Sequence, residues 1–246
     1  MPKKIISNFH GTMFRDVHAG SSWKYVGWEA FTDALKRPWK WPMAAELGLA
    51  AKNLYPLIAS HERGEIGYDV IYKFFNDHVL YKIPIHAVRR YLMEYSALKK
   101  TQDKVDRRVM TPLVRAHNEG AQCSILSTGC DYTIMHTIPW QTGRAPLFDE
   151  IVANPVIGHG KGSRFDLAIY TDEERRQALR RMMPPKDTEL FYIGNGADEK
   201  LCMEEVTDVG GTVVVSLLAP DTFREFAARQ YGARTPSEKE FPRALE

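Results

Sequence analysis

The 246-residue sequence lacks an excess of charge, a cysteine pattern and a long hydrophobic run. Its 33 lysines and arginines are balanced by 31 acidic residues, so the net charge of +2 gives no support to a polyanion-binding protein. The three cysteines, Cys123, Cys130 and Cys202, are odd in number and have no C-x-x-C spacing, which argues for a reducing compartment and against a zinc site. No apolar run approaches the 18 residues that a membrane-spanning helix needs.

These absences set the expected location and partners. Only two isoleucines precede Ser7, far short of a secretion signal, so we expect a cytoplasmic protein that is neither exported nor membrane-spanning. Basic pairs such as Arg89-Arg90 and Arg180-Arg181 are interleaved with acidic residues, and no nucleic-acid-binding signature accompanies them. We interpret them as solvated helix faces and expect neither a nucleic-acid nor a membrane partner.

The residues that are present are those of an ordinary globular protein, with 44% apolar and 26% charged residues. Short apolar segments that end in polar residues or glycine predict buried strands at 3–9, 123–127, 190–193 and 211–218. Apolar residues three and four positions apart predict helices at 44–60, 68–80, 85–98 and 104–118. Strands that alternate with helices indicate a parallel sheet, so we predict an α/β fold.

A glycine-rich segment, residues 158–162, separates two more predicted strands at 150–156 and 164–170. It lacks the spacing of a phosphate-binding P-loop, so we interpret it as the turn of a hairpin. Thr171 and the three acidic residues after it then predict the start of a helix that runs to about Met183.

The functional site of an open parallel sheet lies beyond the carboxyl ends of its strands. Polar residues at these ends should therefore come together: Asn8, His10, Ser127, Thr128, Asn195 and Asp198.

Three of these strand ends resemble motifs of the haloacid dehalogenase (HAD) superfamily of phosphohydrolases. Residues 5–12 (IISNFHGT), 125–129 (ILSTG) and 192–199 (YIGNGADE) match its first, second and fourth motifs in order. The helical block after the first strand is similar to the cap of the phosphoserine-phosphatase-like branch, and the resemblance covers nearly the whole chain. It implies a HAD-like Rossmannoid parallel sheet with an inserted all-helical cap. The core domain would comprise residues 1–16 and 119–246, and the cap residues 17–118.

The chain departs from that family where the chemistry takes place. In the family one aspartate attacks phosphorus, a second protonates the leaving oxygen, and acids of the fourth motif hold magnesium. The matching positions here are Asn8, His10 and Asn195. A neutral carboxamide is a poor nucleophile, and magnesium prefers anionic oxygen ligands, so we expect no aspartyl-phosphate chemistry, no magnesium and no other cofactor.

The family's third motif expects a lysine before the fourth, and none lies between Lys161 and Lys186. Asp172 or Glu173 occupies its place, and the charge of Arg175 or Arg176 could substitute. We favour an ordinary solvated helix face for the two arginines. Glu199 is interpreted as a first-turn acid of the next helix, whereas Asp198 is either such an acid or a site residue.

Tryptophans concentrate after the first strand, at positions 23, 28, 39 and 41. We expect most of them in the core of the cap and one or two along an apolar substrate pocket.

Three functions remain open. The first is a divergent HAD-superfamily protein that lacks the aspartate nucleophile and acts as a metal-independent hydrolase or lyase on a small anionic metabolite. His10, Asn8 and Asp198 are its candidate catalytic residues, although His10 is also compatible with a simple turn residue. The candidate ligand-binding residues are Gly11, Thr12, Ser127, Thr128, Gly129 and Asn195. The second function is a non-catalytic metabolite-binding protein, and the third is a residual phosphatase that uses Asp16 or Asp131.

Overall fold

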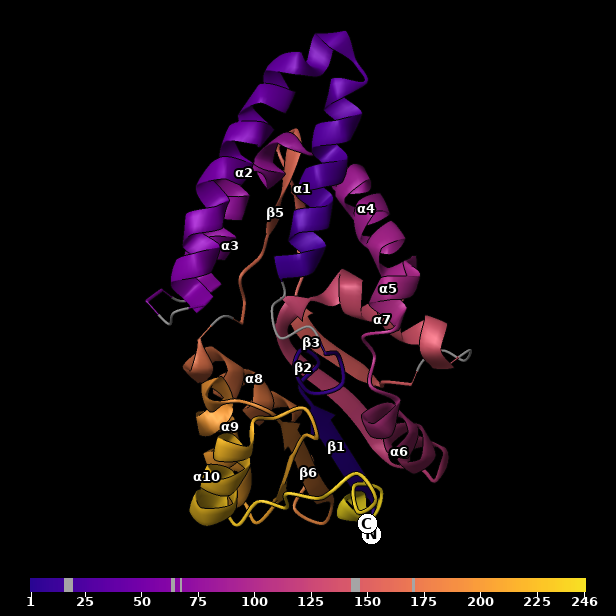
Figure 1. Cartoon of the computed structure of the whole chain (residues 1–246). Helices are drawn as coiled ribbons and strands as arrows, with labels where there is room; N and C mark the ends of the chain where they lie inside the picture. Colours follow the sequence, from indigo (N-terminus) through magenta and orange to yellow (C-terminus); the bar gives the residue numbers. More distant parts are fainter. Residues whose placement is uncertain (16–19, 63–64, 67, 143–146, 170) are drawn as a thin grey trace.

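The structure is a computed structural model that describes residues 1–15, 20–62, 65–66, 68–142, 147–169 and 171–246 (Figure 1). Its centre is a parallel five-stranded sheet with the order β3-β2-β1-β6-β7. The strands are β1 (Lys3–Ser7), β2 (Gln122–Cys130), β3 (Glu150–Asn154), β6 (Glu189–Gly194) and β7 (Thr212–Val215). The predicted α/β fold with a Rossmann-like parallel sheet is confirmed.

Both faces of the sheet are covered by helices, because the side chains of each strand alternate between two apolar clusters. Ile5 belongs to a cluster with α6 (Arg107–Asn118), α7 (Asp131–Thr142) and the C-terminal turn η4 (Arg243–Leu245). Ile6 points to the opposite face. The helices of that face are α8 (Asp172–Met182), α9 (Lys200–Asp208) and α10 (Asp221–Tyr231).

Helices inserted after β1 form a separate layer with its own apolar cluster. They are α1 (Gly20–Leu35), η1 (Pro38–Lys40), α2 (Trp41–Glu62), α3 (Tyr68–His78), η2 (Leu80–Lys82), α4 (Ile85–Ala97) and α5 (Lys99–Gln102). The long α1–α2 hairpin rises away from the sheet and forms the top of the molecule in Figure 1. These helices are the inserted cap that the resemblance implied.

The packing of α6 bears on the limits of the cap. Val109 and Leu113 of α6 share a cluster with Ile5 and Ile125 of the sheet, not with the cap helices. We therefore propose that α6 belongs to the core domain, although the expected cap extended to residue 118. The expected boundary between residues 16 and 17 lies outside the described residues.

The predicted hairpin exists, but both of its strands were misplaced, since the second strand covers Gly162–Phe165 and residues 166–169 are not part of it. Residues 150–154 form β3 and pair in parallel with β2. The antiparallel hairpin instead joins β4 (Val156–His159) to β5 (Gly162–Phe165). Pro155 lies between β3 and β4 and has no backbone N–H, so it separates the strands. Phe165 of the hairpin packs against Trp23 of the cap, with ring centroids 3.9 Å apart.

The expectation that most of the four tryptophans lie in the cap core is wrong. Only Trp23 is buried, whereas Trp28, Trp39 and Trp41 are 62%, 77% and 58% exposed. The exposed three lie on the α1–η1–α2 hairpin, which extends beyond the rest of the chain (Figure 1). Despite these exposed aromatic side chains, no helix in the described part of the chain is long and apolar enough to cross a bilayer.

Candidate active site at the carboxyl ends of the strands

The strand ends bring the first, second and fourth sequence motifs together. Asn8 directly follows β1, and Asn195 directly follows β6, the neighbour of β1. Ser127 lies in β2, on the other side of β1. The pairing of β2 with β3 is interrupted between Leu126 and Cys130, so the backbone around Ser127 departs from the regular sheet.

Two carboxamides in contact occupy the centre of the site. Asn8 is 6% exposed, its Oδ1 accepts a hydrogen bond from Phe9 N (2.8 Å), and its Nδ2 donates to the His10 carbonyl (3.1 Å). Asn8 Nδ2 also lies 3.0 Å from the Asn195 side-chain amide, and the Thr12 hydroxyl lies 2.8 Å from the same amide. The side-chain amides of the two asparagines therefore hydrogen bond to each other and to groups of the loop around them.

His10 lies beside a hydroxyl. Its Nδ1 is 3.4 Å from Ser127 Oγ, and its ring meets the rings of Phe9 and Phe14 edge-on. Ser127 Oγ also accepts a hydrogen bond from Gly129 N (3.1 Å). A Cβ atom on Gly129 would lie 2.1 Å from His10 Cε1, so only glycine leaves room for the imidazole. Two of the predicted site residues, Ser127 and Gly129, thus lie beside the His10 ring.

The turn after His10 also depends on a glycine. Gly11 has a φ of +69°, and a Cβ atom there would lie 2.3 Å from Asn195 Nδ2. The Thr12 carbonyl accepts a hydrogen bond (2.7 Å) from the hydroxyl of Ser216, which is fully buried after β7. Ser216 was missed by the sequence analysis, because the predicted strand at 211–218 included it, whereas β7 ends at Val215 and leaves Ser216 at the strand end.

The Glu199 carboxylate accepts hydrogen bonds from the backbone of the fourth-motif loop. The side chain is fully buried, and its Oε2 accepts hydrogen bonds from Asn195 N (2.6 Å) and Gly196 N (3.2 Å). Its Oε1 accepts from Tyr192 Oη (3.0 Å). Burial raises the pKa of Glu199 to about 7, while Arg175 and the N–H and O–H donors act in the opposite direction. Glu199 is therefore more than a first-turn acid, because it positions the backbone that carries Asn195.

The interpretation of Arg175 as part of a solvated helix face is wrong. Its side chain is 3% exposed, donates to the Asp198 carboxylate (3.0 Å) and lies 3.6 Å from Glu199 Oε1. Burial disfavours its charge, but Asp198 and Glu199 raise the pKa of Arg175, so it stays charged. Arg176, in contrast, is partly exposed and pairs with Glu173 on the helix surface.

Of the candidates for the third motif, Arg175 is the one that reaches the fourth-motif loop. Asp172 accepts a hydrogen bond from Leu201 N, and Glu173 pairs with Arg176. The expected roles of two other residues also change. The Asp198 carboxylate is 69% exposed and pairs with Arg175, not with His10. The Thr128 carbonyl accepts hydrogen bonds from Asn154 Nδ2 and Tyr72 Oη, which ties cap helix α3 to the core.

Of the two candidate acids of a residual phosphatase, the structure describes only Asp131. Asp131 begins α7, and its Oδ1 accepts a hydrogen bond from Tyr132 N (2.5 Å). Burial raises the pKa of this carboxyl. Asp16 lies outside the described residues.

The groups at the strand ends do not fit magnesium. In the described part of the chain, no three histidine, cysteine or acidic side chains are grouped so that they could hold a metal ion. Asn8 and Asn195 contact each other, whereas metal ligands would direct their oxygens at a shared cation. Magnesium prefers hard, anionic oxygen ligands, and these two side chains are neutral.

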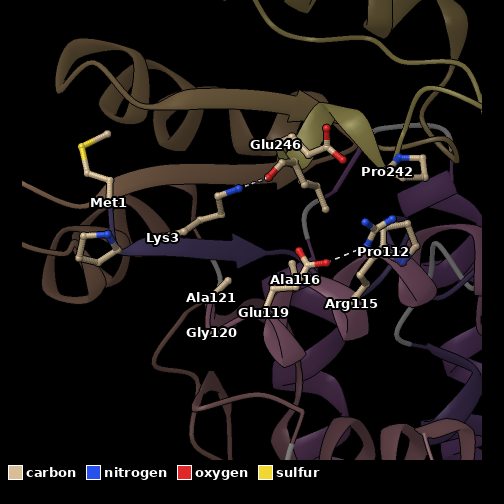
Figure 2. Close-up of a pocket in the computed structure, with 12 residues that line it drawn as sticks. Met1, Lys3, Pro112, Arg115, Ala116, Glu119, Gly120, Ala121, Pro242 and Glu246 are labelled. Carbon is tan, nitrogen blue, oxygen red and sulfur yellow. Dashed lines mark hydrogen bonds and ion pairs between the residues drawn. The ribbon is translucent and has the colours of Figure 1, made fainter.

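Figure 2 shows a cavity of about 260 Å³ at the opposite end of the sheet. It lies where both termini meet the end of α6, and its walls include the Arg115–Glu119 ion pair. Lys3 donates a hydrogen bond to the Leu245 carbonyl there. The cavity lies at the amino ends of β1 and β2, so it is separate from the candidate active site.

No protein-family model matches the sequence, and neither does any curated protein. Solved structures do match. A protein of unknown function from Bordetella pertussis Tohama I has a TM-score of 0.66 at 14% identity, covering 97% of this chain and 99% of that chain. A probable phosphoserine phosphatase from Vibrio cholerae has a TM-score of 0.59 at 13% identity, covering 92% of this chain and 58% of that chain.

A third similar structure is a HAD family hydrolase from Salmonella enterica serovar Typhi, with a TM-score of 0.54 at 14% identity, covering 92% of this chain and 66% of that chain. The fold is therefore that of the HAD superfamily of hydrolases. More narrowly, it is the phosphoserine-phosphatase-like form of that fold, with helices inserted after the first strand. The resemblance in the motifs is confirmed at the level of fold.

Proposed function

We propose that this protein uses the HAD-like fold as a metal-independent hydrolase or lyase that acts on a small anionic metabolite. The observation that carries the proposal is the contact between Asn8 and Asn195 next to the His10–Ser127 pair. Position 8 therefore offers a carboxamide and no carboxylate nucleophile. The imidazole of His10 lies beside it and can carry a proton.

His10 is the proposed acid or base. Histidine transfers protons near neutral pH more readily than any other side chain, and His10 is partly exposed at the strand ends. Ser127, Asn8 and Asn195 supply neutral hydrogen-bonding groups around it. The site also lies just before the N-terminus of α7, whose dipole favours a negatively charged ligand.

A non-catalytic binding protein is the second candidate. The mutual hydrogen bonds of Asn8, Thr12 and Asn195 favour it, because they form a largely buried polar cluster that contains no carboxylate nucleophile. The chemistry of His10 distinguishes the two candidates.

The test compares the wild-type protein with the His10→Ala variant in a metabolite pool followed by mass spectrometry. An enzyme should deplete one anionic metabolite, and His10→Ala should slow that conversion about a hundredfold to ten-thousandfold while ligand affinity changes little. The His86→Ala variant removes an exposed histidine of the cap and should behave like the wild type. If the wild type converts nothing, and both the wild type and His10→Ala retain a co-purifying ligand, the protein binds its metabolite without turning it over.

A further inference from the structure

A second cavity lies in the cap, away from the strand ends. It is a groove of about 550 Å³ between α1, α2 and α3, within the size range of small-molecule sites. Its apolar walls include Trp28, Phe31, Leu47, Leu54, Ile58 and Phe75. Two exposed aromatic residues, Trp28 and Tyr55, also line the groove. Trp23 and Trp28 line this groove, which lies away from the strand ends, whereas the sequence analysis expected one or two tryptophans along a substrate pocket.

Small residues leave the groove open. Gly27 of α1 and Gly48 of α2 both line it. A Cβ atom on Gly27 would meet no heavy atom within 4 Å, and one on Gly48 would only touch Phe31 at 3.6 Å. The space above Gly27 is therefore empty, although most residue types could occupy that helical position.

Two cations flank this apolar groove. Lys24 and Lys52 line it from opposite helices, and both are exposed. Neither has an ion-pair partner among the residues that the structure describes, whereas Lys82 elsewhere in the cap pairs with Glu46. An apolar channel with two unpaired cations is complementary to a molecule with a hydrocarbon chain and an anionic head.

Trp23 carries a buried hydrogen-bond donor beside the apolar walls of the cap. It lines the groove and is 2% exposed, yet its indole N–H has no hydrogen-bond partner in the described structure. A buried donor without an acceptor destabilises a protein, so most are paired. The indole nitrogen of Trp23 has almost no exposed area, so it does not open into the groove, and Lys24 and Lys52 are the polar groups that a ligand there can reach.

We propose that the cap groove binds a single-chain acyl anion. Its chain lies along the apolar walls over Gly27 and Gly48, and its head pairs with Lys24 and Lys52. This site is distinct from the His10 site, so the two proposals can fail separately.

The first experiment titrates the full-length protein calorimetrically with decanoate below its micelle concentration. The wild type should bind one decanoate saturably. The Gly27→Leu variant should lose this binding without a lower melting temperature, because its side chain enters open space and leucine favours a helix more than glycine does. Gly27→Ala is the matched control and should still bind, because one methyl group fills little of the groove. Ala51→Leu blocks the groove from α2 and should have the same effect as Gly27→Leu.

The second experiment isolates the charge. The Lys24→Gln/Lys52→Gln variant should bind decanoate about threefold to tenfold more weakly, the size expected for two exposed ion pairs. Its affinity for decanol, which has the same chain without the charge, should not change. The Lys99→Gln/Lys100→Gln variant removes two exposed lysines outside the groove and should match the wild type.

Three kinds of result would overturn the proposal. The first is a failure of the decanoate titration itself, in which either the wild type binds no decanoate or a folded Gly27→Leu variant still binds it. The second is a wild-type dimer that Gly27→Leu converts to a monomer in light scattering without any decanoate binding, which would make the groove an interface with a second copy. The third is flotation with phosphatidylglycerol vesicles but no binding of free decanoate, which would make it a membrane-docking surface.

Discussion

At the scale of single residues, Asn8 and Asn195 decide the chemistry of the site. Two carboxylates at this separation would repel each other unless a cation lay between them. Two carboxamides instead hydrogen bond directly, as Asn8 Nδ2 and the Asn195 amide do at 3.0 Å. We propose that two amides in place of the two acids of the HAD motifs leave the site without a carboxylate nucleophile at position 8 and without the charge that a metal would balance.

The Asn8→Asp/Asn195→Asp variant should regain a response to magnesium. Without metal, repulsion between the new carboxylates should lower its melting temperature below that of the wild type. Millimolar magnesium chloride should restore it, because a ligand at a hundred times its Kd stabilises the folded state by about 2.7 kcal/mol. Sodium chloride at equal ionic strength is the control. A wild type whose melting temperature rises with magnesium would contradict the proposed metal independence.

Gly11→Ala should destabilise the protein more than Gly120→Ala does. Both glycines have positive φ, so alanine strains each backbone by about 1–2 kcal/mol. At Gly120 the new methyl group meets nothing within 4 Å, whereas at Gly11 it collides with Asn195. Urea unfolding of the two variants measures the difference. Equal losses of stability would mean that the contact between the Gly11 turn and Asn195 is not tight.

At the scale of elements, helix α8 supports the fourth-motif loop through one arginine. Thr171 and Glu174 form the capping box that begins the helix, as the sequence predicted. That start sets which residues face the sheet, and it places Arg175 inward and Arg176 outward. Adjacent identical residues thus have opposite roles.

Replacement of Arg175 by methionine should lower the free energy of unfolding by about 3–5 kcal/mol, because it leaves Glu199 buried without its cation. Arg176→Met, the matched control one residue away, should change it by less than about 0.5 kcal/mol. Adding Glu199→Gln to Arg175→Met should recover part of the loss, because no buried charge then remains. Equal effects of the two single substitutions in urea unfolding would contradict the assigned role of Arg175.

At the scale of the whole molecule, three apolar clusters each contain one cysteine. Cys123 belongs to one face of the sheet, Cys202 to the other face and Cys130 to the cap. All three are free thiols, and burial raises the pKa of each to about 12. Each thiol therefore reports on the opening of its own cluster.

Native protein at pH 8 should react very slowly with iodoacetamide, because the thiols are both inaccessible and protonated. In increasing urea, Cys130 should be alkylated before Cys123 and Cys202. Its cluster consists mostly of cap helices, and it lies where the pairing of β2 with β3 is interrupted. Mass spectrometry of the alkylated peptides gives the order. Simultaneous alkylation of all three would show that cap and sheet unfold as one unit.

The sequence by itself determined the parallel sheet and the convergence of its polar loops. Apolar segments of strand length that end in polar residues require burial on both faces and align their carboxyl ends. This was sufficient to bring Asn8, His10, Ser127 and Asn195 to one edge. It was also sufficient to identify the HAD-like fold, because each motif is a local pattern at a strand end.

Tertiary structure alone decided which of several residues of the same type are buried and which are exposed. Arg175 and Arg176 have the same chemistry, and only the packing of α8 on the fourth-motif loop distinguishes them. Trp28 could not be recognised as exposed, because its burial depends on helices that a single segment does not contain. The cap groove is also a tertiary feature, since it exists only where α1, α2 and α3 meet. Burial of this kind depends on contacts between distant segments, and local sequence patterns do not record them.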